Sequence, residues 1–411
     1  MHTTEFDLHL PPFELERGAR LVELVLRGWM SEPAEPSWLP STWTTRVAPR
    51  TSEREQQHVR PVGPPADMDE RVSAPERPTI LVVHALTGDM RVGGSSGWWE
   101  PVVGDGRAID TGRYRVLCFN NLGSCYGSSG PDDPLFPAAD PGSDGGVGAP
   151  ASTSAAQQPE LANALPPTVT TWDQARAILA ALDTMGIEQV DLLVGGSVGG
   201  MIVLCLTALA PERFRRVMPI ASSAAASPWI IGFNHIGRQC ILANPGPRGL
   251  ELARQIAHMT YRAEPGLVQR QGRSTAAPDG CDLSAPYRVQ TYLEYQGAKL
   301  VQRFSSRAYV CQLGAMDHHD LERAPRWADA AFACHEPWGV HRLQTQLFCV
   351  GIDSDALYLP TQMRSLAVQA RTAGITASYL EIHSPHGHDG FLIEWDQLNQ
   401  LLRSVLQTPA G

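Results

Sequence analysis

Residues 191–209 read DLLVGGSVGGMIVLCLTAL. A short apolar segment leads into a glycine-rich turn, and a second apolar segment, long enough for a helix, follows it. Within this turn Ser197 carries the only side-chain hydroxyl. Gly195-x-Ser197-x-Gly199 is the pattern of a nucleophile elbow, a sharp strand-to-helix turn that lifts a serine clear of a sheet. Small neighbours leave room for the strained backbone, and the following helix points its N-terminus at the serine. An ordinary glycine-rich turn or a phosphate loop is the alternative, but the strand before and the helix after favour the elbow.

Strand-like and helix-like segments alternate on both sides of this elbow. Buried-strand patterns occur at 79–84, 190–195 and 215–221 and at the start of 114–131. The segment TWDQARAILAALDTMG, residues 171–186, has the period of a helix, and Thr171 and Gln174 are expected to form its capping box. This alternation predicts a mostly parallel sheet with helices on both faces.

The pattern divides the chain into an interrupted core and an insertion. Residues 1–225 and 341–411 are predicted to form the two parts of an α/β-hydrolase core, since they carry the strand patterns and the elbow. Residues 226–340 have helical periods instead, and they are predicted to form an inserted helical lid.

Three further segments are read from their turn residues and composition. Residues 13–29 are expected to form a hairpin around Gly18. Residues 31–78 and 132–168 are rich in proline, glycine, serine or charge and lack periodicity, which is typical of flexible inserts.

Composition excludes several classes of protein. The 411 residues are 43% hydrophobic, enough for a large core, and the net charge of −10 argues against nucleic acid or an anionic membrane surface as partner. No apolar run reaches the roughly 18 residues that span a bilayer, and the N-terminus lacks a basic start and an apolar stretch. The eight cysteines are scattered without a CxxC pair, which indicates free thiols and no zinc site. We therefore expect a cytoplasmic enzyme without a metal.

A serine nucleophile needs a base and an acid that orients the base, and in this fold they follow in the order serine, acid, histidine. The stretch GIDSDALYLP, residues 351–360, offers two carboxylates, and HSPHGHDGF, residues 383–391, offers three imidazoles. We predict Asp355 as the acid because it lies further into its loop. We predict His388 as the base because the preceding glycine permits a bent loop.

The other aspartate and the other two histidines of these stretches are expected to have no catalytic role. Asp353 is expected to be a turn-capping carboxylate, and His383 and His386 are expected to be surface histidines. The oxyanion hole should use the backbone N–H of Val198 and one N–H from the loop HALTG, for which Leu86 is the candidate.

Several motifs in order make the prediction more specific. They are HALTGD (84–89), GWWEPVVGDGRAIDTGRY (97–114), NNLGSCYGSSGP (120–131), GGSVGGM (195–201), TYLEYQGAKLVQRF (291–304), GAMDHHDL (314–321), GIDSDALYLP (351–360) and SPHGHDGFLIE (384–394). Together they resemble the homoserine O-acetyltransferase family, acyltransferases with an α/β-hydrolase fold and a helical lid. The resemblance covers nearly the whole chain except 31–78 and 132–165.

The resemblance implies a substrate site and a reaction. Ser197, Asp355 and His388 take the triad roles, and Arg238 in GRQCI and Asp389 after the histidine bind the amino acid. A guanidinium suits the carboxylate of homoserine and a carboxylate suits its ammonium. The alternatives are a surface ion pair for the arginine and a loop cap for the aspartate.

The implied activity is transfer of an acetyl group from acetyl-CoA to L-homoserine in methionine biosynthesis, through an acyl-serine intermediate. The resemblance also implies no permanently bound cofactor and a homodimer formed through the lid. Ser124, in LGSCYG, keeps a serine acceptor or a succinyl-CoA donor open. A carboxylesterase and a non-catalytic scaffold with the same fold are the further alternatives; the complete triad argues against the scaffold.

Overall fold

The computed structural model describes residues 2–33, 44–46, 77–137, 168–277, 284–327 and 345–409, together with the single residues 280 and 282. Most of the predicted inserts 31–78 and 132–168 therefore lies outside the described residues. Of the first insert, residues 31 and 32 end a strand and residues 44–46 form a short strand of their own.

One large sheet organises the described chain. Its strands are β1 (His2–Leu10), β4 (Leu24–Glu32), β5 (Thr44–Arg46), β6 (Thr79–Val83), β9 (Arg115–Phe119), β10 (Leu192–Gly196), β11 (Arg216–Ile220), β12 (Gln346–Ile352) and β13 (Thr376–Ile382). The strand order is β13-β12-β11-β10-β6-β9-β4-β1-β5. Neighbours from β13 to β9 are parallel, and β4, β1 and β5 add antiparallel pairs at one edge. The predicted α/β-hydrolase fold with a mostly parallel sheet is confirmed.

The N-terminal strand β1 is a feature that the sequence analysis missed. It pairs with β4 along its whole length, from His2 opposite Glu32 to Leu10 opposite Leu24. Phe6 and Leu8 are buried, so the alternation of apolar residues in EFDLHL was an available signal. The expected hairpin around Gly18 exists, because β2 (Phe13–Glu14) and β3 (Arg20–Leu21) pair across it.

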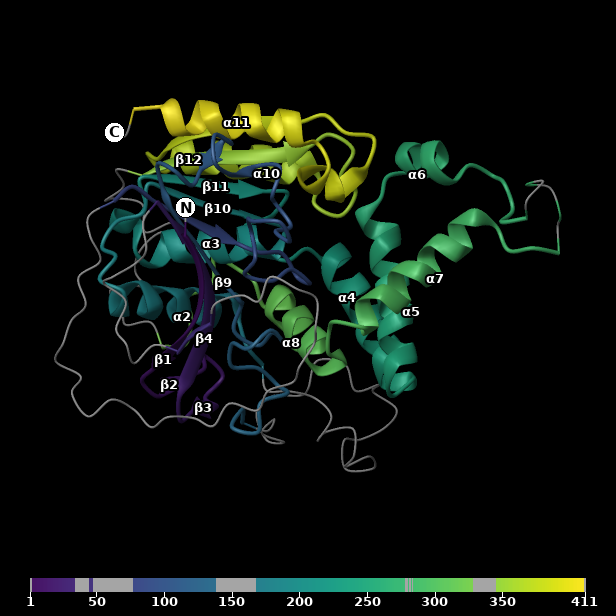
Figure 1. Ribbon diagram of the computed structural model, residues 1–411, viewed down its shortest axis with the longest axis horizontal. Coiled ribbons are helices and arrows are strands. Elements are labelled where there is room, and N and C mark those ends of the chain that lie inside the picture. Colours follow the sequence, from purple (N-terminus) through teal and green to yellow (C-terminus); the bar gives the residue numbers. More distant parts are fainter. Residues whose placement is uncertain are drawn as a thin grey trace.

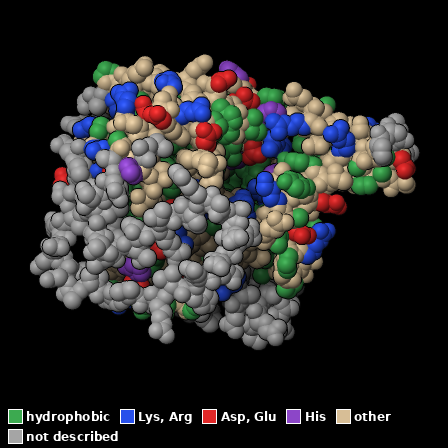
Figure 2. Space-filling model, viewed as in Figure 1, with side chains coloured by type: hydrophobic (Ala, Val, Ile, Leu, Met, Phe, Trp, Pro, Cys, Tyr) green, Lys and Arg blue, Asp and Glu red, His purple; other side chains and the backbone are tan. Residues whose placement is uncertain are grey.

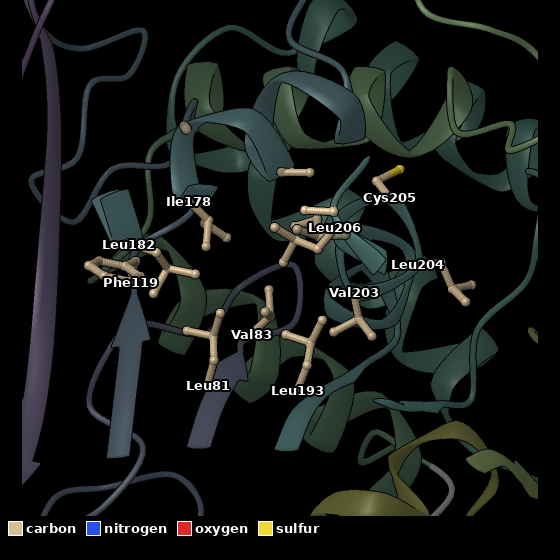
Figure 3. Close-up of a cluster of buried hydrophobic side chains, with 14 of the residues drawn as sticks. Leu81, Val83, Phe119, Ile178, Leu182, Leu193, Val203, Leu204, Cys205 and Leu206 are labelled. Carbon is tan, nitrogen blue, oxygen red and sulfur yellow. The ribbon is translucent and has the colours of Figure 1, made fainter. Parts of the chain in front are cut away.

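Helices cover both faces of the sheet (Figure 1). They are α2 (Thr171–Thr184), α3 (Val198–Leu209), α10 (Pro360–Thr372) and α11 (Trp395–Gln407). Successive strand residues point to opposite faces, so Leu81 packs in the cluster with α2 and α3, whereas Val82 packs in the cluster with α11. Figure 3 shows the first cluster, in which Leu81 and Leu193 from neighbouring strands lie beneath Val203 of α3.

The start of α2 differs from the prediction by one residue. Its N-cap is Thr170, whose hydroxyl accepts the N–H of Asp173 while the Asp173 carboxylate accepts the N–H of Thr170. The predicted capping box of Thr171 and Gln174 is therefore wrong. Thr171 instead contacts the ring of His319 through its hydroxyl, at 3.0 Å, and Gln174 donates to the carbonyl of Leu122.

Among the described residues, five helices lie between β11 and β12, and most of them extend away from the sheet (Figure 1). They are α4 (Pro228–Ala243), α5 (Pro247–Tyr261), α6 (Glu264–Gln271), α7 (Arg288–Val301) and α8 (Ser306–Asp317), all within the predicted lid range of 226–340. Buried residues of α4, α5 and α8 pack with Leu86 and Val198 of the core. The inner face of the lid thus closes over the elbow.

Within the described ranges, two further short strands and two 3-10 turns lie outside the large sheet and its helices. They are β7 (Val103–Gly104), β8 (Ile109–Asp110) and the 3-10 turns η2 (Pro211–Arg213) and η4 (Gly387–Leu392). Six cysteines are described and all are free thiols; Cys281 and Cys334 lie outside the described residues. In the part of the chain that is described, no helix combines the length and apolar character needed to cross a membrane.

Candidate active site

The elbow at Ser197 is a strained turn between β10 and α3. Its backbone has φ 59° and ψ −128°, a conformation that L-residues rarely adopt. The N–H of Ser197 donates to the carbonyl of Ile220 on the neighbouring strand, at 2.9 Å. Strain of this kind persists only where the surrounding structure enforces it, and it is concentrated at functional sites.

Glycine is required on both sides of the serine by close backbone contacts. A Cβ on Gly195 would lie 2.7 Å from backbone atoms of Gly199, and one on Gly199 would overlap the carbonyl oxygen of Val83. The first turn of α3 is therefore pressed against the ends of β10 and β6. This close approach brings the N-terminus of α3 beside the loop that follows β6.

We expect Gly199→Ala to destabilise the protein by about 2–3 kcal/mol, because the methyl group meets backbone that cannot move aside. Urea unfolding measures the loss. Gly232→Ala is the matched control, since Gly232 lies in helix α4 and a Cβ there meets nothing within 4 Å. Equal stability of Gly199→Ala and the parent protein would contradict the close packing of the elbow.

Asp355 and His388 form a buried pair. Their Oδ2 and Nδ1 atoms are 2.7 Å apart, and the side chains are 0% and 4% exposed. The other oxygen of Asp355 accepts the backbone N–H groups of Leu357 and Tyr358, at 2.8 and 3.0 Å. Burial alone would lower the pKa of His388, but the charge and hydrogen bond of Asp355 outweigh burial, so that pKa is raised.

The pair meets the serine at one edge of the sheet. Ser197, Asp355 and His388 follow β10, β12 and β13, whose carboxyl ends lie together in a parallel sheet. Phe391 bridges them, because its ring contacts the ring of His388 edge-on at 5.7 Å and lies where a Cβ of Gly196 would be. The structure thus places the three predicted catalytic residues at the same edge of the sheet.

A second aspartate–histidine pair lies outside the site. His383 Nδ1 is 3.0 Å from Asp353 Oδ2, and the His383 side chain is 72% exposed. Asp353 also accepts the backbone N–H of Ser384 at 3.0 Å, so its carboxylate joins the loop after β12 to the loop after β13 and does not cap its own turn as expected. The surface prediction is confirmed for His383 and wrong for His386, which is only 9% exposed because Gly266 of lid helix α6 packs against it.

The two residues predicted to supply the oxyanion hole lie in one buried cluster. The N–H groups of Leu86 and Val198 donate no hydrogen bond to any described residue. The Leu86 loop is fixed by His84, whose Nε2 accepts the N–H of Asn121 at 3.0 Å, so its Nδ1 carries the proton and donates to the carbonyl of Ala85 at 2.8 Å. Burial lowers the pKa of His84, which keeps the ring neutral in this role.

The lid holds the same loop from the other side. Arg303, which follows α7, donates to the carbonyl of Thr87 and to the hydroxyl of Tyr126, both at 2.6 Å. Thr87 is the neighbour of Leu86 in the chain, so the direction of the Leu86 amide depends on the lid as well as on the core.

Arg238 is buried inside the lid and is not the surface residue that the alternative interpretation required. It is 3% exposed, and its Nη2 lies 2.5 Å from Oδ2 of Asp317 on α8. Asn234 donates to the other oxygen of Asp317 at 2.7 Å. The Nε and Nη1 atoms of Arg238 have no acceptor among the described residues. A buried guanidinium with free donors is suited to a planar anion such as a carboxylate.

Asp389 also faces an arginine of the lid. Its Oδ2 is 3.1 Å from Nε of Arg262, which follows α5. Burial raises the pKa of Asp389, and the charges of Arg262, His388 and Arg254 only partly oppose that rise. Asp389 is thus a partly shielded carboxylate beside the catalytic histidine.

Sequence reasoning missed three residues of the site, namely Tyr358, Asp317 and Arg262. Tyr358 and Asp317 lie within the quoted stretches GIDSDALYLP and GAMDHHDL, but their contacts join segments that are distant in sequence. No local pattern could identify them. Among the described residues, no group of three or more histidine, cysteine or acidic side chains is arranged to hold a metal.

A serine in an elbow between strand and helix, with an acid and a histidine at the same sheet edge, is the arrangement of the α/β-hydrolase class. The family model for the alpha/beta hydrolase fold matches residues 78–334. Homoserine O-acetyltransferase from Moorella thermoacetica is 36% identical over 353 residues, which are 80% of this chain and 86% of that protein. The chain therefore belongs to the homoserine O-acetyltransferase family.

Solved structures share the fold over almost the whole chain. Homoserine O-acetyltransferase from Staphylococcus aureus has a TM-score of 0.67 at 24% identity, covering 99% of this chain and 96% of that one. Esterase E22 has a TM-score of 0.68 at 14% identity, covering 99% and 100%. Because a transferase and an esterase fit equally well, the fold alone does not distinguish transfer from hydrolysis.

Proposed function

We propose that this protein transfers an acetyl group from acetyl-CoA to the hydroxyl of L-homoserine, a step of methionine biosynthesis. The observation that carries the proposal is the buried Arg238, whose free Nε and Nη1 donors suit the carboxylate of an amino acid. Asp389, beside the histidine, suits its ammonium group. An esterase for simple esters needs neither charge, and the names of the relatives at 36% identity support the same assignment.

In the first half of the reaction, Ser197 is acylated. His388 takes the proton of Ser197, and the serine oxygen attacks the thioester carbonyl. The N–H groups of Leu86 and Val198 stabilise the oxyanion, aided by the N-terminus of α3. The thiol of CoA leaves with the proton from His388. Asp355 orients the ring and stabilises the imidazolium.

In the second half, the acetyl group passes to the acceptor. In this scheme homoserine occupies the hollow between core and lid that is visible in the space-filling view, where basic side chains lie near the rim (Figure 2). His388 takes the proton of the acceptor hydroxyl, the oxygen attacks the acyl carbon, and Ser197 leaves with its proton restored. No resident cofactor takes part in this scheme.

Water is the competing acceptor, and burial of the site opposes it. Ser197 is 6% exposed and His388 3% exposed beneath the apolar inner face of the lid. Asp317 contributes by holding the guanidinium of Arg238 in place without using its Nε and Nη1 donors. An acceptor that supplies a carboxylate completes these contacts with charge-assisted hydrogen bonds, whereas water supplies no charge to the guanidinium.

The function is tested by thiol release from acetyl-CoA with and without L-homoserine, with the product identified by mass spectrometry. We expect rapid release only with homoserine, and O-acetylhomoserine as the product. L-serine and succinyl-CoA in parallel reactions test the open choices of acceptor and donor. Thiol release that homoserine does not accelerate, with acetate as product, would identify a hydrolase instead.

We expect Arg238→Met to raise the homoserine KM and lower kcat/KM by roughly ten- to a hundredfold, because a charge-assisted contact is lost. The acylation burst with acetyl-CoA should survive, since no homoserine is involved, and hydrolysis should rise relative to transfer. Stopped-flow thiol detection reads both. The double variant Arg238→Met/Asp317→Asn removes the uncompensated buried charge and keeps the result independent of folding.

Arg248→Met is the matched control, because Arg248 forms an exposed pair with Glu251 on the lid. It should leave the homoserine kinetics within a factor of about two. If Arg238→Met behaves like this control, the arginine serves only the lid, and the acceptor carboxylate binds elsewhere.

We also propose a cytoplasmic homodimer. Large hydrophobic side chains of the lid are exposed, among them Trp229, Ile236, Met259 and Tyr295, which supports a dimer contact there. The six described free thiols support a reducing compartment. Light scattering in solution tests the dimer, and the mass of a single chain would exclude it.

A further inference from the structure

We infer that Tyr358 is a further catalytic residue, whose hydroxyl donates a hydrogen bond to the Ser197 oxygen whenever that oxygen carries negative charge. The inference rests on the proposed function only in taking Ser197 as the nucleophile. It concerns the serine oxygen and adds no covalent step.

Tyr358 is connected to the acid and the base of the triad. Its backbone N–H donates to Asp355 Oδ1 at 3.0 Å. Its ring lies 5.2 Å from the ring of His388, tilted by 32°. The residue is fully buried, in the same cluster as Leu86 and Val198. These contacts fix the ring firmly, so the position of its hydroxyl is also fixed.

The hydroxyl of Tyr358 is the unexplained part of this arrangement. It lies beside the side chain of Ser197 and forms no hydrogen bond of ordinary geometry with any described residue. A buried hydroxyl without a partner is costly and calls for an explanation. Burial raises the pKa of Tyr358 well above its usual value, so the group remains a protonated donor.

The reaction supplies the missing acceptor twice. As Ser197 gives its proton to His388, its oxygen gains negative charge, and this charge passes to the carbonyl oxygen as the bond to the acyl carbon forms. When the acetyl group leaves for the acceptor, the bond from the serine oxygen to carbon breaks and the charge returns, until His388 gives the proton back. Tyr358 keeps its own proton in both steps and stabilises the charge through its O–H.

This role differs from that of the oxyanion hole. The amides of Leu86 and Val198 come from the loop after β6 and the start of α3. In the proposed mechanism they donate to the carbonyl oxygen of the acetyl group. Tyr358 comes from the loop after β12, next to His388, and its hydroxyl donates to the serine oxygen. The hydroxyl thus acts on the atom that both half-reactions share.

The test is Tyr358→Phe, which removes the hydroxyl and keeps the ring and the backbone N–H. We expect acylation and deacylation rates to fall roughly ten- to a hundredfold, as for loss of one hydrogen bond to a charged oxygen. Tyr309→Phe is the matched control, since Tyr309 lies in the same buried cluster and its hydroxyl neighbours Tyr261 instead of the triad. It should change both rates less than threefold.

Three readouts decide the result. Thermal unfolding of Tyr358→Phe should match that of the parent, because the lost hydroxyl has no ordinary partner; a marked loss of stability would show a structural partner and overturn the inference. The acid limb of the pH profile should stay in place, because Asp355 still sets the pKa of His388. A rate within threefold of the parent in both half-reactions would also overturn the inference.

The two proposals fail separately. Release of 4-nitrophenol from 4-nitrophenyl acetate reports acylation of Ser197 without any amino acid. If the parent protein shows this burst but transfers nothing to homoserine, the proposed acceptor is wrong and the comparison of Tyr358→Phe with Tyr309→Phe still proceeds on the ester. If both tyrosine variants acylate like the parent, the Tyr358 inference alone is wrong.

Discussion

Ser197→Ala is expected to lower acetyl transfer by roughly four to six orders of magnitude and to leave the fold intact. The variant cannot form an acyl-enzyme, because the only atom lost is the attacking oxygen. Its N–H still donates to the carbonyl of Ile220, and its side chain contributes little to the core. Steady-state thiol release measures the loss, and mass spectrometry of the intact protein after mixing with acetyl-CoA should show no acetyl adduct.

Ser222→Ala provides the control for this variant. Ser222 is a buried serine that packs against Gly200 in the first turn of α3, and its hydroxyl has no partner among the described residues. Its replacement should retain the acetyl adduct and most of the activity. An adduct or undiminished turnover in Ser197→Ala would mean that the elbow does not carry the nucleophile.

Asp355→Asn is expected to lower kcat by roughly two to four orders of magnitude. The amide no longer stabilises the imidazolium, and it removes the acceptor that holds Nδ1 of His388. Asp355 raises the pKa of His388, so loss of its charge must lower that pKa. Because the base acts when neutral, the acid limb of the profile of kcat/KM against pH should move to lower pH.

Asp353→Asn tests the choice between the two carboxylates. Asp353 also forms a pair with a histidine, His383, but that pair is exposed to solvent. The kcat of Asp353→Asn should stay within about threefold of the parent, and the acid limb of its profile of kcat/KM against pH should not move. A larger loss in Asp353→Asn than in Asp355→Asn would reverse the assignment of the acid.

Much of the fold could be predicted because its signals are local. Fully buried strands such as β10 read as continuous apolar runs, and the glycine pattern marks the turn after it. The exact N-cap of α2 could not be read, because Thr170 and Thr171 are both good caps, and it is the following acidic residue, Asp173, that favours the first.

Parts of the site could not be predicted because they depend on contacts between distant segments. His386 looks like a surface residue within its own loop, and only the packing of α6 buries it. Tyr358 becomes a candidate only when its ring is seen against His388 and its hydroxyl beside Ser197. The three candidate triad residues could be proposed from the sequence because the order of serine, acid and histidine along the chain is a property of the fold.

The spread of the triad over β10, β12 and β13 has a consequence for the newly made chain. Translation delivers Ser197 and its elbow first, then the whole lid, then Asp355, and His388 only near the end. Because domains fold as they leave the ribosome, the nucleophile is formed while its base does not yet exist. The nascent chain therefore carries its serine without the histidine proposed to activate it, and we expect chemistry only once the segment after β13, which holds His388, is in place. A chain that stops before His388 is expected to be inactive.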